Sequence, residues 1–198
     1  MAKWTSDVVY LNGLDLFSSV VDRFPVDAWG RPSPCAGWRA LDVLGHVTTA
    51  TNFGISLMKG ETPSWQPSDR PGDSITGDPA ESWRRLATEA RQLVAQVDLK
   101  QEVDTPMGRR TVAEGLSFPA VDLFVHAWDL GRTAGIEVEI PPEAAEFTQE
   151  VLGRMPADQL RSPSVFAAEA EAAAGATPTE AYIAWTGRDP RWAPASGS

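Results

Sequence analysis

The sequence is poor in cysteine and histidine, with one Cys and two His among its 198 residues. A single cysteine excludes an internal disulfide, and it also excludes a structural zinc site built from several thiolates. We therefore look first to histidine and carboxylate side chains for a transition-metal site in this chain.

Positive charge is also scarce, because 17 Lys and Arg residues face 27 Asp and Glu residues, for a formal net charge of −10. Nucleic acids and anionic membrane surfaces attract basic proteins, so we expect neither as a partner. No apolar run approaches the roughly 20 residues of a membrane helix, and the N-terminus shows no secretory signal pattern. We therefore expect a cytoplasmic protein.

Apolar side chains are abundant enough for one folded core. Hydrophobic residues make up 42% of the chain, and eight of them are tryptophans. This length suits a single core with an appendage. We expect a bundle in residues 1–140 and a helical extension packed on it in residues 141–198, with the last residues disordered.

Helical periodicity and capping motifs predict four long helices. The third opens with a capping box at Asp78, and the fourth opens with a Thr-x-x-Glu box at Thr111. We expect the fourth to be continuous with a kink near Pro119; a start at Ser117 is the alternative. The expected ranges are 6–25, 39–58, 78–97 and 111–135.

Shorter elements complete the expected fold. Residues 103–107 and 109–112 are predicted to form a hairpin about Gly108. A fifth helix is expected from 141 to 155, and a short one after a capping box at 177–180. The composition of 167–174 is compatible with a helix but does not require one. The predicted fold class is all-α, a four-helix bundle with a short hairpin before the fourth helix and small C-terminal helices.

The polar side chains that most need explanation lie in residues 121–130. In a helix, Asp122, His126 and Asp129 stand at i, i+4 and i+7 and share one face, although their neighbours are almost wholly apolar. Buried carboxylates need a partner. A divalent cation is a suitable one, because it accepts carboxylate oxygen and neutral imidazole nitrogen together.

The other histidine, His46, follows Asp42 by four residues in an apolar helical segment. Two helices lying side by side would bring His46, Asp122 and His126 together and leave coordination positions open, as in catalytic metal sites. The alternatives are a buried neutral His46 bonded to the backbone or to Asp42, and an Asp122 that only caps or faces solvent. We assign Asp42 and Asp129 to orienting a histidine or bonding across the bundle, not to ligation.

Four further residues are weighed as site candidates. Trp65 lies in the predicted loop 61–77 and either folds over a pocket or pins the loop to the surface. Trp38 and Trp128 are pocket candidates, with the core favoured. Cys35 has no histidine near it in sequence, so we interpret it as buried filler and not as a nucleophile. The sequence names no catalytic acid or base.

Three separated motifs carry a resemblance to a known family. They are Ser-Pro-Cys-Ala-Gly-Trp at 33–38 followed by Asp42 and His46, Asp-x-x-x-His-x-Trp-Asp-Leu at 122–130, and Gly-Arg-Asp-Pro-x-Trp at 187–192. In this order they resemble the actinobacterial metal-binding branch of the DinB-like superfamily. That branch is similar to the N-terminal domain of mycothiol-dependent maleylpyruvate isomerase.

The resemblance implies a four-helix bundle that holds a divalent metal, usually zinc or nickel, through His46, Asp122 and His126. The isomerase pattern has Glu at the position of Asp122. The three-histidine site of other DinB-like proteins is excluded because this chain has two histidines. The resemblance also implies activity with a low-molecular-weight thiol such as mycothiol.

A metal with open coordination positions can hold a thiolate at neutral pH. The leading hypothesis is therefore a metal-dependent thiol transferase or isomerase, in which a metal-bound thiolate attacks a small electrophile. The alternatives are a non-catalytic metal or small-molecule binding module, and a biosynthetic isomerase, cyclase or hydrolase that uses the same pocket. The apolar excess also permits a homodimer.

Overall fold

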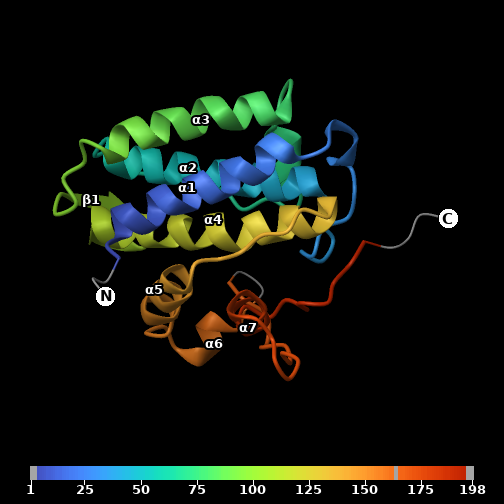
Figure 1. The fold of residues 1–198 in the computed structure, drawn as a ribbon. Helices are drawn as coiled ribbons and strands as arrows, with labels where there is room; N and C mark the ends of the chain where they lie inside the picture. The colour runs from blue at the N-terminus through green and yellow to red at the C-terminus, as the bar shows by residue number, and fades with distance from the viewer. Residues whose placement is uncertain (1–3, 163–164, 195–198) are drawn as a thin grey trace.

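Four long helices form the body of the protein, and the predicted all-α bundle is confirmed (Figure 1). The structure, a computed structural model, describes residues 4–162 and 165–194. The expected disorder of the last residues falls partly on 195–198, outside the described residues. Within the described chain, no helix is long and apolar enough to cross a membrane. The long helices are α1 (Ser6–Arg23), α2 (Ala40–Met58), α3 (Pro79–Val94) and α4 (Val112–Ala134).

Helix α4 runs along the bundle and is buried on nearly every side. It begins at the predicted capping box, where the Thr111 hydroxyl accepts the Glu114 N–H and the Glu114 carboxylate accepts the Thr111 N–H at 2.8 Å. The helix continues through Pro119, so the alternative start at Ser117 is wrong. It ends at Gly135, whose φ of 70° is the left-handed conformation that glycine tolerates best.

Close contact between α1 and α4 holds the core together. At Gly13 of α1, a Cβ atom would lie only 2.9 Å from the Leu123 Cβ atom of α4. The missing side chain therefore lets the two helices approach each other closely. Large side chains that are fully buried fill the rest of the core, among them Tyr10, Leu14, Phe17, Leu44, Leu57, Trp83, Leu116, Leu123 and Phe124.

The connections between the long helices agree largely with the sequence. The predicted hairpin is confirmed as β1 (Glu102–Thr105) paired antiparallel with β2 (Gly108–Thr111), which leads directly into α4. The loop after α2 contains a 3₁₀ turn, η2 (Pro71–Ser74), and another, η1 (Val26–Ala28), follows α1. Helix α3 opens after Asp78, whose carboxylate accepts the Glu81 N–H at 2.7 Å, and ends before the expected 97.

The C-terminal elements lie on one side of the bundle, next to α4 (Figure 1). They are α5 (Pro142–Leu152), α6 (Ala157–Leu160) and α7 (Pro178–Trp185). Helix α6 was not predicted, and residues 167–174 are not helical, because their small side chains offer little apolar surface to bury. The end of the chain returns to α4, where the Arg132 guanidinium donates to the Trp192 carbonyl at 2.6 and 3.0 Å.

Candidate metal centre

The three predicted ligand residues lie together between α2 and α4. His46 comes from α2, and Asp122 and His126 come from successive turns of α4. The Nε2 atom of His46 lies 3.3 Å from Oδ2 of Asp122, and the two imidazole rings are 4.9 Å apart. One ligand atom from each residue lies within 4.8 Å of the other two. We call these three residues the outer group.

The outer group offers donor atoms of the kinds that divalent transition metals bind in proteins. Two imidazole nitrogens with one carboxylate oxygen form a donor set of catalytic zinc sites, which leaves positions open for water or substrate. Metal bonds of 2.0–2.3 Å in tetrahedral geometry separate neighbouring donors by about 3.3–3.8 Å, a range that includes the His46–Asp122 distance of 3.3 Å. The side chains of His46 and Asp122 are 20% and 30% exposed, so the group opens toward solvent.

His126 is held in one orientation by Asp129. Its Nδ1 lies 2.7 Å from Oδ2 of Asp129, so in the neutral ring we assign the proton to Nδ1. Nε2 is then unprotonated, and its lone pair is available to a metal ion. Burial lowers the pKa of His126, although the Asp129 carboxylate acts in the opposite direction. The imidazole is therefore held in the neutral form that binds metals.

Behind His126, Asp129 forms a buried ion pair with Arg188. The Nε and Nη2 atoms of Arg188 donate to the two carboxylate oxygens of Asp129 at 2.8 and 2.9 Å. Burial opposes the charge on Asp129, but the Arg188 guanidinium and the bond from His126 outweigh it and hold the pKa of this carboxyl far below its usual range. Arg188 therefore compensates a carboxylate that has no exposed surface.

Cys35 completes this arrangement, which sequence reasoning missed. Its Sγ lies 3.2 Å from Oδ2 of Asp129 and 3.9 Å from Nδ1 of His126, although His126 is 91 positions away in the sequence. Burial and the charge of Asp129 raise the pKa of the Cys35 thiol. We call Cys35, His126 and Asp129 the inner group. Arg188, which lies in the Gly-Arg-Asp-Pro motif, could have been found from the sequence. A buried carboxylate at Asp129 requires a cation, and this motif offers an arginine.

Asp42 does not lie against either histidine. Its Oδ2 accepts the backbone N–H and the Nε–H of Arg39 at 3.0 and 2.9 Å, and its Oδ1 accepts the Gly72 N–H at 3.2 Å. The bond from Arg39 outweighs burial and lowers the pKa of this carboxyl. Asp42 therefore caps α2 and ties η2 to it, and it does not orient a histidine.

Two of the three candidate tryptophans border the outer group. The Trp38 ring lies 5.2 Å from the His46 ring, and the Trp65 ring lies 5.6 Å from it at a right angle. Trp128, in contrast, is buried in the core beneath the Arg132 guanidinium, and no aromatic contact joins it to a histidine in the described chain.

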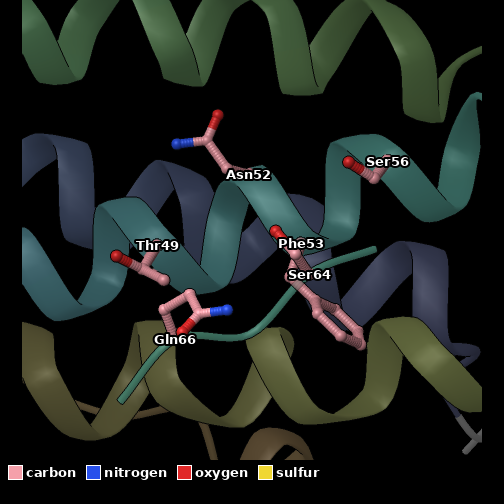
Figure 2. Close-up of a pocket in the computed structure, with 6 residues that line it drawn as sticks. All are labelled: Thr49, Asn52, Phe53, Ser56, Ser64 and Gln66. Atoms are coloured by element: carbon pink, nitrogen blue, oxygen red, sulfur yellow. The ribbon is translucent and has the colours of Figure 1, made fainter. Parts of the chain in front are cut away.

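A polar recess adjoins this region on the surface of α2. Figure 2 shows the loop that carries Ser64 and Gln66 passing beside α2. The Trp65 ring, between these two residues in sequence, contacts both His46 and the recess residue Phe53. The Trp65 ring is therefore a neighbour of both the recess and the outer group. The recess is lined by Thr49, Asn52, Phe53, Ser56, Ser64 and Gln66.

Comparison with solved structures reveals the same fold in an enzyme. A histidine-to-alanine mutant of mycothiol-dependent maleylpyruvate isomerase superposes with a TM-score of 0.57 at 18% identity, over 74% of this chain and 66% of that one. The unmutated enzyme gives a TM-score of 0.53 at 18% identity over the same shares. The match thus spans just under two thirds of the isomerase, and it confirms the predicted DinB-like bundle.

Two sequence comparisons bear on the family. Uncharacterized proteins of two Mycobacterium tuberculosis strains, CDC 1551 / Oshkosh and ATCC 25618 / H37Rv, are 23% identical over 179 residues, which is 89% of this chain and 94% of each relative. The family described as the mycothiol maleylpyruvate isomerase N-terminal domain matches residues 13–131. This match covers more than half of the chain and includes all three residues of the outer group. The chain therefore belongs to the mycothiol maleylpyruvate isomerase N-terminal domain family.

Proposed function

We propose that this protein binds a divalent metal through His46, Asp122 and His126, and that it catalyses a thiol-dependent isomerisation or S-transfer on a small electrophile. The observation that carries the proposal is the outer group itself, with His126 held by Asp129 at 2.7 Å so that Nε2 is free. Membership of a family named after a mycothiol-dependent isomerase supports the choice of reaction.

Zinc or nickel would suit the outer group, and such an ion supplies the positive charge that keeps a bound thiol deprotonated at neutral pH. The chain's own residues prepare that chemistry. Asp129 keeps the proton on Nδ1 of His126, and burial keeps this ring neutral. The Trp38 and Trp65 rings beside His46 provide apolar walls that limit water and hold the electrophile.

The nucleophilic sulfur must come from outside the chain. Cys35 is the single cysteine, and burial raises its pKa, so its thiol stays protonated at neutral pH. A low-molecular-weight thiol such as mycothiol is therefore the proposed co-substrate, with its polar part in the recess beside Trp65. A free cysteine and a small thiol both fit the reducing cytoplasm, which we propose as the place of action.

Elemental analysis of untagged protein tests the metal site directly. We expect about one equivalent of zinc or nickel in the wild type, and loss of this metal in His46→Ala and in Asp122→Asn. The matched control is Asp27→Asn, which changes a carboxylate that is 80% exposed and paired only with a surface arginine. This control should retain the metal. Absence of metal from the wild type, even after reconstitution, would mean that the outer group is structural.

A thiol-addition assay tests the activity. The metal-loaded protein is mixed with mycothiol and a panel of activated alkenes and epoxides, and both thiol consumption and double-bond isomerisation are followed. We expect acceleration by the wild type and none by Asp122→Asn. Metal binding without acceleration across the whole panel would instead identify a non-catalytic metal-binding module.

A further inference from the structure

The outer and inner groups share His126, and the inner group is already in contact with a positive charge of the protein, the Arg188 guanidinium. We propose that Arg188 is a positioning residue: its guanidinium fills the inner group of Cys35, His126 and Asp129, and thereby confines a divalent metal to the outer group. This inference rests on the proposed function, because it concerns where the metal of that function binds.

The inner group is by composition a competent metal site. It offers a sulfur, an imidazole nitrogen and a carboxylate oxygen, and these atoms lie within 4.8 Å of one another. Sulfur ligands bind zinc and other soft ions strongly, so this group would compete with the purely nitrogen and oxygen donors of the outer group. Something in the fold must decide between them.

Arg188 already contacts two of the three residues that would bind an inner metal, Asp129 and Cys35. Its Nε and Nη2 donate to both oxygens of Asp129 at 2.8 and 2.9 Å, and Nη2 also lies 3.6 Å from the Cys35 sulfur. The arginine side chain is 14% exposed and the aspartate is fully buried. A permanent positive charge that already satisfies both carboxylate oxygens repels a second cation.

The same contacts direct His126 toward the outer group. Its Nδ1 lies 2.7 Å from Oδ2 of Asp129, which is shorter than the about 3.3–3.8 Å between two donors of one tetrahedral metal. This distance is that of a hydrogen bond. Nδ1 therefore acts as a donor to Asp129, and Nε2 is left for the metal beside His46 and Asp122.

Arg188 brings the C-terminal segment into the centre. It follows Asp129 by 59 positions and lies beyond residues 13–131, the part that matches the family. Two features after α7 fix its position: Gly187 has a φ of 83°, and the Thr186 hydroxyl accepts an Nη1–H of Arg188 at 3.4 Å. The centre is therefore assembled from the bundle together with the extension.

Cobalt(II) absorption tests the proposal, because a sulfur ligand produces a near-ultraviolet charge-transfer band that nitrogen and oxygen ligands do not. The wild type should bind about one equivalent of cobalt without this band, even in excess cobalt. Arg188→Gln should gain the band, and Cys35→Ser combined with Arg188→Gln should lose it again. Arg188→Lys keeps the charge and should show no band. The control Arg31→Gln removes an arginine from an exposed pair and should resemble the wild type.

A sulfur band in the wild type or in Arg188→Lys would overturn the proposal, as would a folded Arg188→Gln protein that shows no band. If Arg188→Gln does not fold, the wild type in excess cobalt and Arg188→Lys still decide, since a band in either refutes it and its absence in both supports it. Failure of the proposed function gives a different result: the wild type binds no cobalt, while Arg188→Gln gains a site with the sulfur band.

Discussion

Asp129→Asn is the substitution that probes the buried part of the centre most directly. Four donors converge on this carboxylate: Nδ1–H of His126, two N–H groups of Arg188, and the thiol of Cys35. Asparagine has the same size, so it leaves no cavity. It provides one acceptor oxygen in place of two, and it leaves the Arg188 charge buried without a counter-ion.

The expected loss of stability follows from that uncompensated charge. Removing one partner of a buried ion pair costs about 3–5 kcal/mol of unfolding free energy, a large part of the roughly 5–15 kcal/mol typical of a domain. The same change frees the His126 ring to rotate. Loss of an aspartate that orients a ligand histidine lowers metal affinity by roughly 10–100-fold.

Both quantities are measurable on the same variant. Urea unfolding of the metal-free protein, followed by circular dichroism, gives the unfolding free energy, and zinc titration against a competing chelator gives the affinity. Asp27→Asn, on the surface, serves as the control and should change neither. A stability loss below about 1 kcal/mol, the level of an exposed pair, together with unchanged affinity, would refute the ion-pair reasoning.

Three further predictions concern the scaffold and its pH dependence. Gly45→Ala places a Cβ 2.3 Å from the Pro71 carbonyl oxygen and should destabilise the protein by about 1–3 kcal/mol. The control is Gly30→Ala, whose Cβ would have no atom within 4 Å and should not change stability; thermal unfolding of the two variants makes the comparison. Thr111→Ala removes the cap of α4 and should lower the unfolding free energy measured in urea by about 1 kcal/mol. Thr5→Ala is the control, because the Thr5 side chain makes no capping hydrogen bond to α1. Equal losses in the two variants would contradict a stabilising role of the Thr111 cap. The pKa values of Asp42 and Glu114 are lowered in the folded state, so their contribution to stability is complete above their unfolded values near about 4 and is lost as pH falls through the folded ones. The melting temperature should therefore fall between about pH 5 and pH 3, and the fall should be shallower in Asp42→Asn combined with Glu114→Gln; an unchanged slope would count against this account.

The local elements were predictable because their signals are local. The box of Thr111 and Glu114 fixed the start of α4, and Gly135 fixed its end. Helix α6 escaped prediction because a single turn has no periodicity to detect. Of the two roles considered for Asp42, orienting a histidine was suggested by its spacing from His46. The bonds of Asp42 to Arg39 and Gly72 are instead those of a helix cap, which a carboxylate three residues after Arg39 also fits.

The outer group was within reach of the sequence, because Asp122 and His126 share a helix face and His46 is the one other histidine. The convergence of α2 and α4 was the only additional requirement, and a four-helix bundle supplies it. The structure brings these residues together, and their role as metal ligands stays a prediction.

The sequence by itself determined the four long helices, the caps of α3, α4 and α7, the hairpin and the residues of the outer group, since these depend on spacings of a few positions. Only the tertiary structure decided the inner group and its contact with Arg188, because Cys35 lies 94 positions from Asp129 and 153 from Arg188, and no periodicity relates them. Their meeting at Asp129 follows from burial: a carboxylate removed from water is stable only where the folded chain brings a cation and donors to it.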